Sequence, residues 1–190
     1  MRKAAFLAVI AAAMFLMCAS VHAEGDTKVF DSFEGANDWT AENWDNVGGV
    51  TMMISAEKFS DGKQSLKAVA KDEEEDWKNR FVISREATLD LSASDMYMDI
   101  YTDAPSGVSV AIAFDTAGEY YESGNKLLNQ GWNKDIKFEL GAKDFKCKAS
   151  DWKNSVPLAD RSDISKVFIL VQHPKKMKGV TVFIDNIRFN

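Results

Sequence analysis

The sequence predicts an all-β protein, a jelly-roll β-sandwich made of two antiparallel sheets. Three observations lead to this prediction: runs of alternating apolar and polar residues recur, helical periodicity is nearly absent, and the breaks contain the Gly, Pro, Asp and Asn that turns require. About ten such strands in one domain imply that two sheets pack face to face around the core.

The expected strands follow one another along most of the chain. They are 28–33, 50–55, 65–70, 80–86, 96–102, 108–114, 119–123, 133–140, 166–173 and 180–189. Turn sequences such as FSDGKQ, TDAPSG and HPKKMKG separate them. The segment 141–165 lacks strand alternation, so we expect it to wrap over one end of the sandwich with a short helical turn.

The N-terminal segment has the pattern of a secretory signal peptide. A basic start, an apolar run and a small-residue cleavage pattern ending at Ala23 follow one another over residues 1–23. We therefore expect a secreted or periplasmic protein with a single jelly-roll domain over 24–190. Lipid attachment at Cys18 is the competing hypothesis, but the bulky Met17 stands where a small residue is expected before a lipidated cysteine.

The charge of the chain argues against two classes of partner. The formal net charge is −6, and removal of the expected signal peptide makes it more negative. Nucleic acid and anionic membranes both need a basic face, so neither is expected as the main partner. No further apolar stretch approaches the roughly 18 residues of a membrane-spanning helix, so we expect no membrane span.

Few residues are available for nucleophilic or zinc chemistry. After residue 23 the sequence contains one cysteine, Cys147, and one histidine, His173. This set cannot form an internal disulfide or a structural zinc site, and His173 lacks a nucleophile motif, so we expect no catalytic residues. The 29 acidic residues always include some pair at a distance suitable for glycoside hydrolysis, which leaves an enzymatic alternative open.

The order of several short motifs resembles a known family. FDSFEGANDW comes first and is followed by DGKQSLK, MDIY, QGWNKDIKFEL, DISKVFILV and finally VFIDNIRF. This succession resembles the galactose-binding-like jelly rolls that serve as calcium-containing carbohydrate-binding modules, over essentially the whole of 24–190. The resemblance implies a polysaccharide or oligosaccharide ligand and no catalysis, and it places Trp39 and Trp132 at positions of packing tryptophans.

The resemblance also implies a structural calcium ion that joins the first strand to the last. The matching positions are Asp31, Glu34, the carbonyl of Lys63 in the DGK turn, and Asp185 in the last strand. Calcium binds about six to eight hard oxygen atoms, which loops and strand ends can supply. The alternative for Asp185 is a carboxylate that accepts hydrogen bonds from turn amides at a bulge, and the alternative for Glu34 is a solvated loop residue.

The strand 96–102 is expected to provide the ligand site. Alternation points Met96, Met98 and Ile100 into the core, so the other side chains lie on an open sheet face. These outward residues are Tyr97, Asp99 and Tyr101. Aromatic rings cover the apolar C–H faces of sugars and a carboxylate accepts hydrogen bonds from their hydroxyls, so this face suits sugar recognition.

Other residues would extend the site. The next strand, 108–114, points small side chains outward, which would leave a groove. Arg85 and Gln172 would add donors and acceptors where their strands share the open sheet, and Trp77 would form a platform at the rim. Ordinary surface decoration is the alternative for all of them. The acidic run 72–76 lacks the ligand spacing of a calcium loop and favours a solvated loop.

We therefore predict a secreted, non-catalytic carbohydrate-binding protein stabilised by calcium. The second function class is a structural or interaction protein that contacts other cell-surface proteins through the same face. A flat apolar patch would favour that class, whereas a polar groove flanked by rings favours sugar. The third class is a jelly-roll lyase or hydrolase, which would show converging charged residues with perturbed ionisation.

Overall fold

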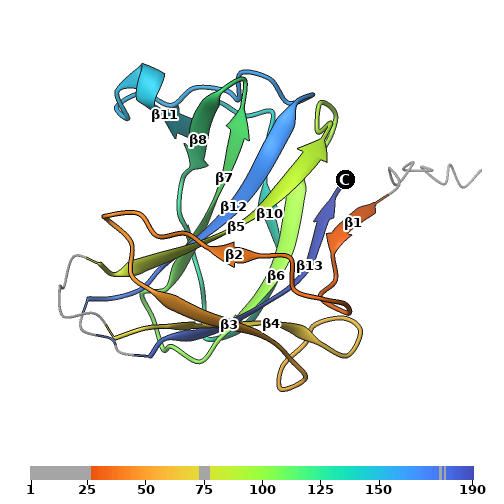
Figure 1. Ribbon diagram of the computed structural model, residues 1–190, viewed down its shortest axis with the longest axis vertical. Helices are drawn as coiled ribbons and strands as arrows, with labels where there is room; N and C mark the ends of the chain where they lie inside the picture. Colours follow the sequence, from red (N-terminus) through yellow and green to blue (C-terminus); the bar gives the residue numbers. More distant parts are fainter. Residues whose placement is uncertain (1–26, 73–77, 176, 178) are drawn as a thin grey trace, which may run out of the picture.

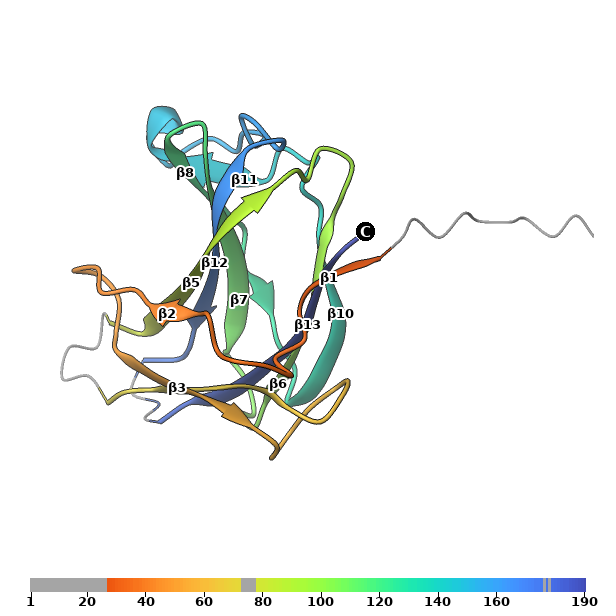
Figure 2. The same ribbon diagram turned by 45° about the vertical axis from the view of Figure 1, so that its right-hand side comes forward.

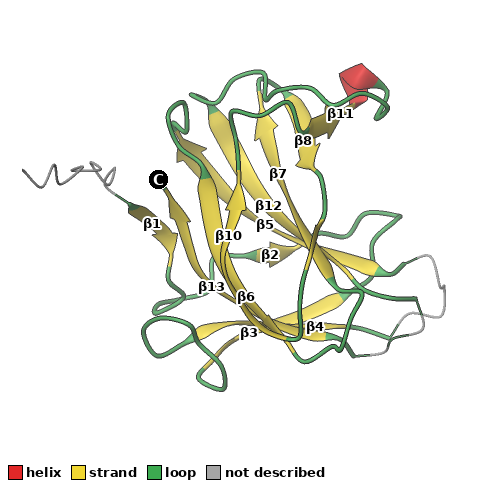
Figure 3. Cartoon of the chain, turned by 180° about the vertical axis from the view of Figure 1, so that it is seen from behind, coloured by secondary structure: helices red, strands yellow, loops and turns green. Residues whose placement is uncertain are grey.

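The computed structural model describes residues 27–72, 78–175, 177 and 179–190. The expected signal peptide with Cys18, the predicted rim residue Trp77 and most of the acidic run 72–76 lie outside the described residues. Within them the chain forms strands joined by turns, and the single helical element is the 3-10 turn Lys148–Ser150, red in Figure 3. No helix of the described part is long and apolar enough to cross a membrane.

Two antiparallel sheets face each other, as Figure 1 and Figure 2 show, so the predicted sandwich is confirmed. Sheet A contains β1 (Lys28–Asp31), β3 (Val50–Ser55), β4 (Ser65–Ala70), β6 (Met96–Thr102), β10 (Gly131–Phe138) and β13 (Thr181–Phe189). Sheet B contains β2 (Thr40–Ala41), β5 (Arg80–Leu89), β7 (Ser109–Thr116), β8 (Glu119–Ser123), β9 (Lys126–Leu127), β11 (Phe145–Cys147) and β12 (Ile164–Gln172).

The order of the strands places β13 and β12 inside their sheets. Sheet A runs β10-β6-β13-β4-β3, and β1 pairs with β13 beyond the end of its pairing with β4. Sheet B runs β11-β8-β7-β12-β5-β2, and β9 pairs with β7. Because β6 and β7 belong to different sheets, two strands that follow each other in the sequence present their outward side chains on opposite faces of the molecule.

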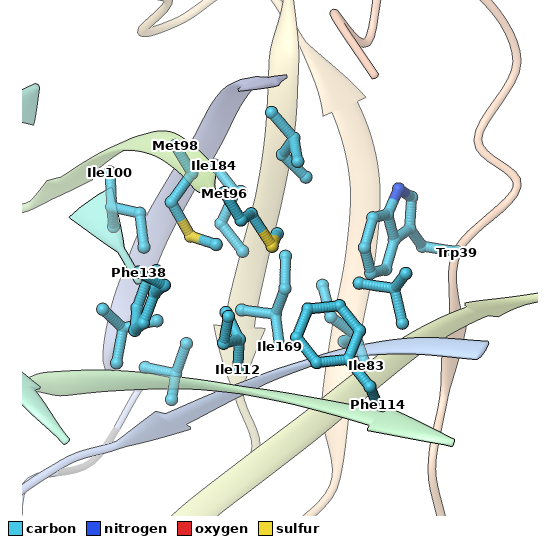
Figure 4. Close-up of a cluster of buried hydrophobic side chains, with 14 of the residues drawn as sticks. Trp39, Ile83, Met96, Met98, Ile100, Ile112, Phe114, Phe138, Ile169 and Ile184 are labelled. Carbon is cyan, nitrogen blue, oxygen red and sulfur yellow. The ribbon is translucent and has the colours of Figure 1, made fainter. Parts of the chain in front are cut away.

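The core lies between the sheets and follows the predicted alternation. In β6 the side chains of Met96, Met98 and Ile100 are fully buried, and in β7 the same holds for Ile112 and Phe114. Figure 4 shows these side chains converging from the two sheets. Removal of this much apolar surface from water is the main force that holds the sheets together.

Strand β13 contains the bulge at which the alternation shifts. Its pairing with β6 changes register between Asp185 and Arg188, and Asn186 adopts the left-handed conformation with φ 48°. Ile184 points into the core, so alternation directs Asp185 to the outer face of sheet A. The extra residue of the bulge then returns Ile187 to the core. A carboxylate in an apolar strand is therefore directed away from the core by local backbone geometry.

All ten expected strands are present, with ends shifted by a few residues. The segment 141–165, expected to lack strands, contains β11, which pairs with β8, and the short helical turn follows directly. That expectation was wrong about β11, because three residues are too few to show alternation. Cys147 closes β11 as a buried free thiol.

Candidate functional site

The outer face of sheet B is hollowed by a groove, which we call the sheet B groove. Its cavity has a volume of 730 Å³. Its lining residues are Glu42, Trp44, Asn46, Arg80, Asp115, Tyr120, Glu122, Trp152, Lys166 and Phe168. They come from strands β5, β7, β8 and β12 and from two segments that rise beside them, the one after β2 and the one after the 3-10 turn.

Small and apolar side chains pack in a buried layer beneath the groove, and of these Phe168 also lines the cavity. A second buried cluster, separate from the main core, contains Val82 of β5, Ala111 and Ala113 of β7, and Phe168 and Leu170 of β12. Alternation places these residues on the outer face because their neighbours Ile83, Ile112 and Ile169 enter the core. Ala111 and Ala113 are fully buried, with Trp44 and Tyr120 packed against their cluster, so they do not open the groove that the sequence predicted beside strand 108–114.

Four aromatic rings meet along the groove. The ring of Tyr120 lies 5.6 Å from Trp44, 5.2 Å from Phe168 and 6.0 Å from Trp152, measured between centroids. These contacts are edge-on or tilted, as the ring quadrupoles prefer. Trp152 keeps 45% of its surface exposed, so an apolar ring face is available to a ligand at this end of the groove.

The backbone that presents Trp152 is unusual. Asp151 and Trp152 both adopt the left-handed region, with φ 53° and 59°. Such conformations are unfavourable for residues with a Cβ and persist where surrounding contacts enforce them, often at functional sites. Here the Asp151 amide donates to the Lys148 carbonyl at 2.8 Å and the Trp152 amide donates to the Cys147 carbonyl at 3.2 Å.

Two ion pairs occupy most of the charged groups in the groove. Lys166 Nζ lies 2.9 Å from Glu42 Oε1, which also accepts a hydrogen bond from Ser84 Oγ at 2.6 Å. Burial alone would raise the pKa of Glu42, but the Ser84 and Lys166 interactions together outweigh it and lower that pKa. The groove therefore holds Glu42 as a carboxylate.

The second pair involves Glu122. Arg80 Nη1 lies 3.3 Å from Glu122 Oε1, and the Tyr120 hydroxyl donates to Glu122 Oε2 at 3.0 Å. Burial, with a smaller effect of the Glu122 charge, raises the pKa of Tyr120 well above its ordinary value. The hydroxyl therefore stays protonated and donates to Oε2, while Arg80 contacts Oε1, so both oxygen atoms of Glu122 have a partner.

Asp115 is different from the other two carboxylates. It lies on β7, and the pKa of its carboxyl is raised, mainly by burial. The charge of Lys166 lowers this pKa in part, and the charges of Glu86 and Glu42 raise it further. No hydrogen bond from a described residue reaches its carboxylate, and the charge of Lys166 acts on it without an ion-pair contact among the described residues. Its oxygen atoms remain available to a ligand.

The predicted ligand residues of β6 lie on the outer face of sheet A, across the sandwich from this groove. The predicted separation of the two faces of β6 is confirmed, but Asp99 is only 4% exposed. It accepts a hydrogen bond from Ser60 Oγ in the loop 56–64 and another from the Asp135 amide in β10, both at 2.8 Å. Tyr101 donates its hydroxyl to Asp103 at 2.6 Å, and Arg188 lies over the ring of Tyr97.

Arg85 and Gln172 do not join these residues, because both belong to sheet B. Arg85 Nη1 lies 2.8 Å from Asp31 Oδ2, near β1. Gln172 is exposed and accepts a hydrogen bond from Asn125 at 3.5 Å, but it does not line the groove. The predicted site residues therefore do not come together in one place.

The positions matched to a calcium site are each occupied by other partners. Asp31 accepts hydrogen bonds from the Trp39 indole and from Arg85, both at 2.8 Å. Glu34 Oε1 accepts the amide of Lys63 at 2.7 Å and that of Gln64 at 2.8 Å, and these amides lower the pKa of Glu34. Lys63, whose carbonyl was the predicted ligand, contacts Glu34 through its N–H group.

Asp185 is fully buried and accepts hydrogen bonds from the Ser60 amide at 2.7 Å, the Asp61 amide at 3.1 Å and the Asn186 amide at 2.8 Å. Burial raises its pKa, and the Ser60 and Asp61 amides act in the opposite direction. This is the arrangement of the alternative interpretation, a carboxylate that binds turn amides at a bulge. Together Glu34 and Asp185 hold residues 60–64, and we call this arrangement the loop clasp.

The donor set does not fit a shared calcium site. Oxygen atoms that accept backbone N–H groups face donors, whereas a cation needs oxygen ligands directed at it. Among the described residues no group of three or more His, Cys, Asp and Glu side chains is close enough to hold a metal ion. Calcium binding stays a prediction of the sequence that these contacts do not support.

Removal of divalent cations is expected to leave stability unchanged, because amides and Arg85 already satisfy the carboxylates that calcium would bridge. The measurement is the Tm of purified protein with EDTA and with added calcium. A Tm that falls in EDTA and recovers with calcium, but not with magnesium, would show that the loop clasp rearranges around a metal.

The sequence analysis missed the aromatic residues of the groove. Trp44 and Trp152 lie in the polar segments AENWDNV and SDWKNS, outside any alternating run. A tryptophan surrounded by polar residues is a usable signal, since such a ring has no local apolar partner and is either covered from afar or exposed for binding. Tyr120 and Glu122 lie two residues apart in β8 and so share one face of that strand. A correct assignment of the strands to the two sheets would have placed both of them in the groove.

Comparison with known proteins places the fold in a defined class. No family model matches the sequence, and no curated protein matches it. A solved structure with the same fold is the family 11 carbohydrate-binding module from Clostridium thermocellum in complex with a β-1,3-1,4-mixed-linked tetrasaccharide, with TM-score 0.60, 15% identity, and coverage of 86% of this chain and 94% of that chain.

Two further solved structures agree with this assignment. The solution structure of CtCBM11 has TM-score 0.61 and 14% identity, with coverage of 88% of this chain and 96% of that chain. The non-crystalline cellulose specific module CBM28 has TM-score 0.56 and 16% identity, with coverage of 86% and 94%. The chain thus has the β-sandwich fold of carbohydrate-binding modules, and at these identities the likeness concerns the fold.

Proposed function

We propose that this chain is a non-catalytic carbohydrate-binding protein that holds a polysaccharide or oligosaccharide in the sheet B groove. The observation that carries the proposal is the groove itself, in which four aromatic rings and several polar side chains line one cavity. Modules that share the fold were solved with a bound tetrasaccharide or are specific for cellulose, which supports the same class of ligand. Export is part of the proposal and rests on the signal-peptide pattern of residues 1–23.

The groove suits a sugar chain in its shape and its chemistry. The exposed ring of Trp152 and the ring of Trp44 would cover the apolar C–H faces of sugar units. Hydroxyl groups would meet carboxylate oxygens and the amide of Asn46, which also lines the cavity. A cell-surface protein partner is less suited, because a hollowed and charged surface lacks the flat apolar contact area that a stable protein interface needs.

One observation favours hydrolysis as a second candidate function. Burial raises the pKa of Asp115, while Ser84 and Lys166 lower that of Glu42, and carboxyl groups with opposite shifts can act as acid and base. Against it, Glu42 is committed to Lys166 and Ser84, and His173 does not line the groove. Binding assays with parallel measurement of released reducing ends would separate the two functions.

Loss of the groove tryptophans is expected to abolish much of the binding. Trp152→Ala and Trp44→Ala should each weaken retention on a bound glycan by about tenfold or more, as aromatic anchors at binding sites commonly do. The measurement is an array of soluble and insoluble glycans, followed by affinity electrophoresis or calorimetry on the positive ones. Phe59→Ala, which removes a 44% exposed ring outside the groove, is the matched control and should bind normally.

The same series distinguishes the two sheet faces. Tyr101→Ala tests the face that the sequence predicted, and a loss of binding in Tyr101→Ala together with normal binding in Trp152→Ala would move the site to sheet A. No retention of the wild-type protein on any glycan of the array would contradict the proposed function as a whole.

A further inference from the structure

We infer that the sheet B groove selects neutral glycans over anionic ones, and that Asp115 is the residue that sets this selectivity. The inference rests on the proposed function and adds the chemical class of the ligand. Among the described residues that line the groove, both cations are paired with carboxylates. Asp115 is the carboxylate that has no such contact, so it stays available to a ligand.

Both cations of the groove are already committed to carboxylates. Lys166 contacts Glu42 at 2.9 Å and Glu86 at 3.3 Å, and Arg80 contacts Glu122 at 3.3 Å. The Lys166 and Arg80 side chains are only 23% and 25% exposed, so they are held in place rather than free in solvent. A uronate or sulfate group entering the groove would have to break one of these pairs to find a positive partner, and would leave a partly buried carboxylate alone.

Asp115 has the opposite requirement. Its carboxylate is partly buried and receives no hydrogen bond from the described residues. The charge of Lys166 attracts it, and the charges of Glu86 and Glu42 repel it. A sugar laid across the groove would remove more water from it, and an ionised carboxylate deprived of water needs donors in return. Sugar hydroxyls donate hydrogen bonds, and those to a carboxylate are stronger than those between neutral groups. A carboxylate of the ligand would offer only a second negative charge.

The position of Asp115 on β7 places it where a ligand must pass. It lies two residues beyond Ala113, which is buried beneath the groove, and it lines the same cavity as Trp152 and Trp44. A chain that stacks on these rings therefore lies close to Asp115. Repulsion between like charges is stronger in such a partly enclosed site than in open water.

The experiment uses the full chain and two forms of one ligand. The first is the neutral polysaccharide that the glycan array shows to bind most tightly, and the second is the same polysaccharide with about a tenth of its primary hydroxyls oxidised to carboxylates. In affinity electrophoresis, wild-type protein should bind the oxidised form at least about fivefold more weakly than the neutral form. Added salt should reduce this difference in affinity, because it screens the repulsion between Asp115 and the carboxylates of the ligand.

Asp115→Asn removes the charge and keeps the size of the side chain. The variant should bind the neutral form about tenfold more weakly, since a charge-assisted hydrogen bond is replaced by a neutral one. Its affinities for the neutral and oxidised forms should then differ by no more than about twofold. Asp163→Asn, the same change at an exposed residue that does not line the groove, is the matched control and should keep the wild-type affinities and gap. Circular dichroism and Tm confirm that each variant folds.

Several outcomes overturn the inference. Equal binding of both forms by wild-type protein would show that the groove does not sense ligand charge, and an unchanged gap in Asp115→Asn would assign the selectivity to another residue. An anionic glycan as the tightest ligand of the array would also overturn it. In these cases glycan binding itself survives, whereas the absence of any bound glycan defeats the proposed function and this inference together.

Discussion

Asp185→Ala is expected to lower the free energy of unfolding by about 3 kcal/mol or more, because it leaves three backbone amides without an acceptor at the centre of the loop clasp. Asp185 is fully buried, and its carboxylate accepts the amides of Ser60, Asp61 and Asn186. The Ser60 hydroxyl, at 3.0 Å, loses a partner as well. Chemical denaturation followed by tryptophan fluorescence measures the change.

Two variants grade this effect. Asp185→Asn keeps one carbonyl oxygen that can still accept the Ser60 and Asp61 amides, so its loss should be clearly smaller. Ser60→Ala removes only a hydroxyl and should cost about 1 kcal/mol. Equal losses in Asp185→Asn and Asp185→Ala would show that charge, rather than hydrogen-bond geometry, holds the loop. A loss below 1 kcal/mol in Asp185→Ala would show that water replaces the carboxylate without penalty.

Trp39→Ala is expected to cost about 3 to 5 kcal/mol, the range found when large buried aromatic residues are truncated. Trp39 is 3% exposed, and its ring lies 6.2 Å from that of Phe30 and 6.4 Å from that of Phe33. Its indole N–H donates to Asp31, which also holds Arg85. The substitution would remove both a packing centre and a tie between the N-terminal segment and sheet B.

The matched comparison is Trp152→Ala, which should lower the free energy of unfolding by only about 1 kcal/mol or less, because Trp152 keeps 45% of its surface exposed. Trp39→Phe should lie between the two, since it keeps most of the ring contacts and loses the hydrogen bond to Asp31. A similar loss of stability in Trp39→Ala and Trp152→Ala would show that the half-exposed Trp152 contributes as much to packing as the buried Trp39.

Most of the fold was predictable because strand alternation is a local property. The faces of β6 were assigned correctly from Met96, Met98 and Ile100 alone. Strands β2, β9 and β11 were missed because two or three residues cannot display a period of two. The ends of the longer strands shifted by a few residues, since pairing with a neighbour, and not local sequence, decides where a strand stops.

Sheet membership was not predictable in the same way. Alternation says which residues share a face of one strand, but it does not say which strand lies beside it. Alternation therefore suggested that Ala111 and Ala113 lie next to Tyr101, whereas β6 and β7 lie in opposite sheets. The groove was predicted beside β6, but the observed cavity lies over sheet B, and two of its aromatic rings, Trp44 and Trp152, lie in segments that carry no period.

Burial of Asp99 depends on a contact that local sequence cannot reveal. An outward position on β6 predicts exposure, yet Ser60 covers Asp99 from a loop 39 residues earlier. The interpretation of Asp185 shows the converse. A carboxylate within an apolar strand did indicate a specific partner, and the alternative of turn amides at a bulge matches the observed contacts.

The pairing of β1 with β13 has a practical consequence for how the protein can be presented. Lys28 lies opposite Phe189, so both ends of the described domain lie at the same end of sheet A, as Figure 1 shows near the C-terminus. The groove opens on the outer face of the other sheet. A tether, fusion partner or sensor-chip linkage attached at either end would therefore leave the groove directed away from its support and open to long polymers.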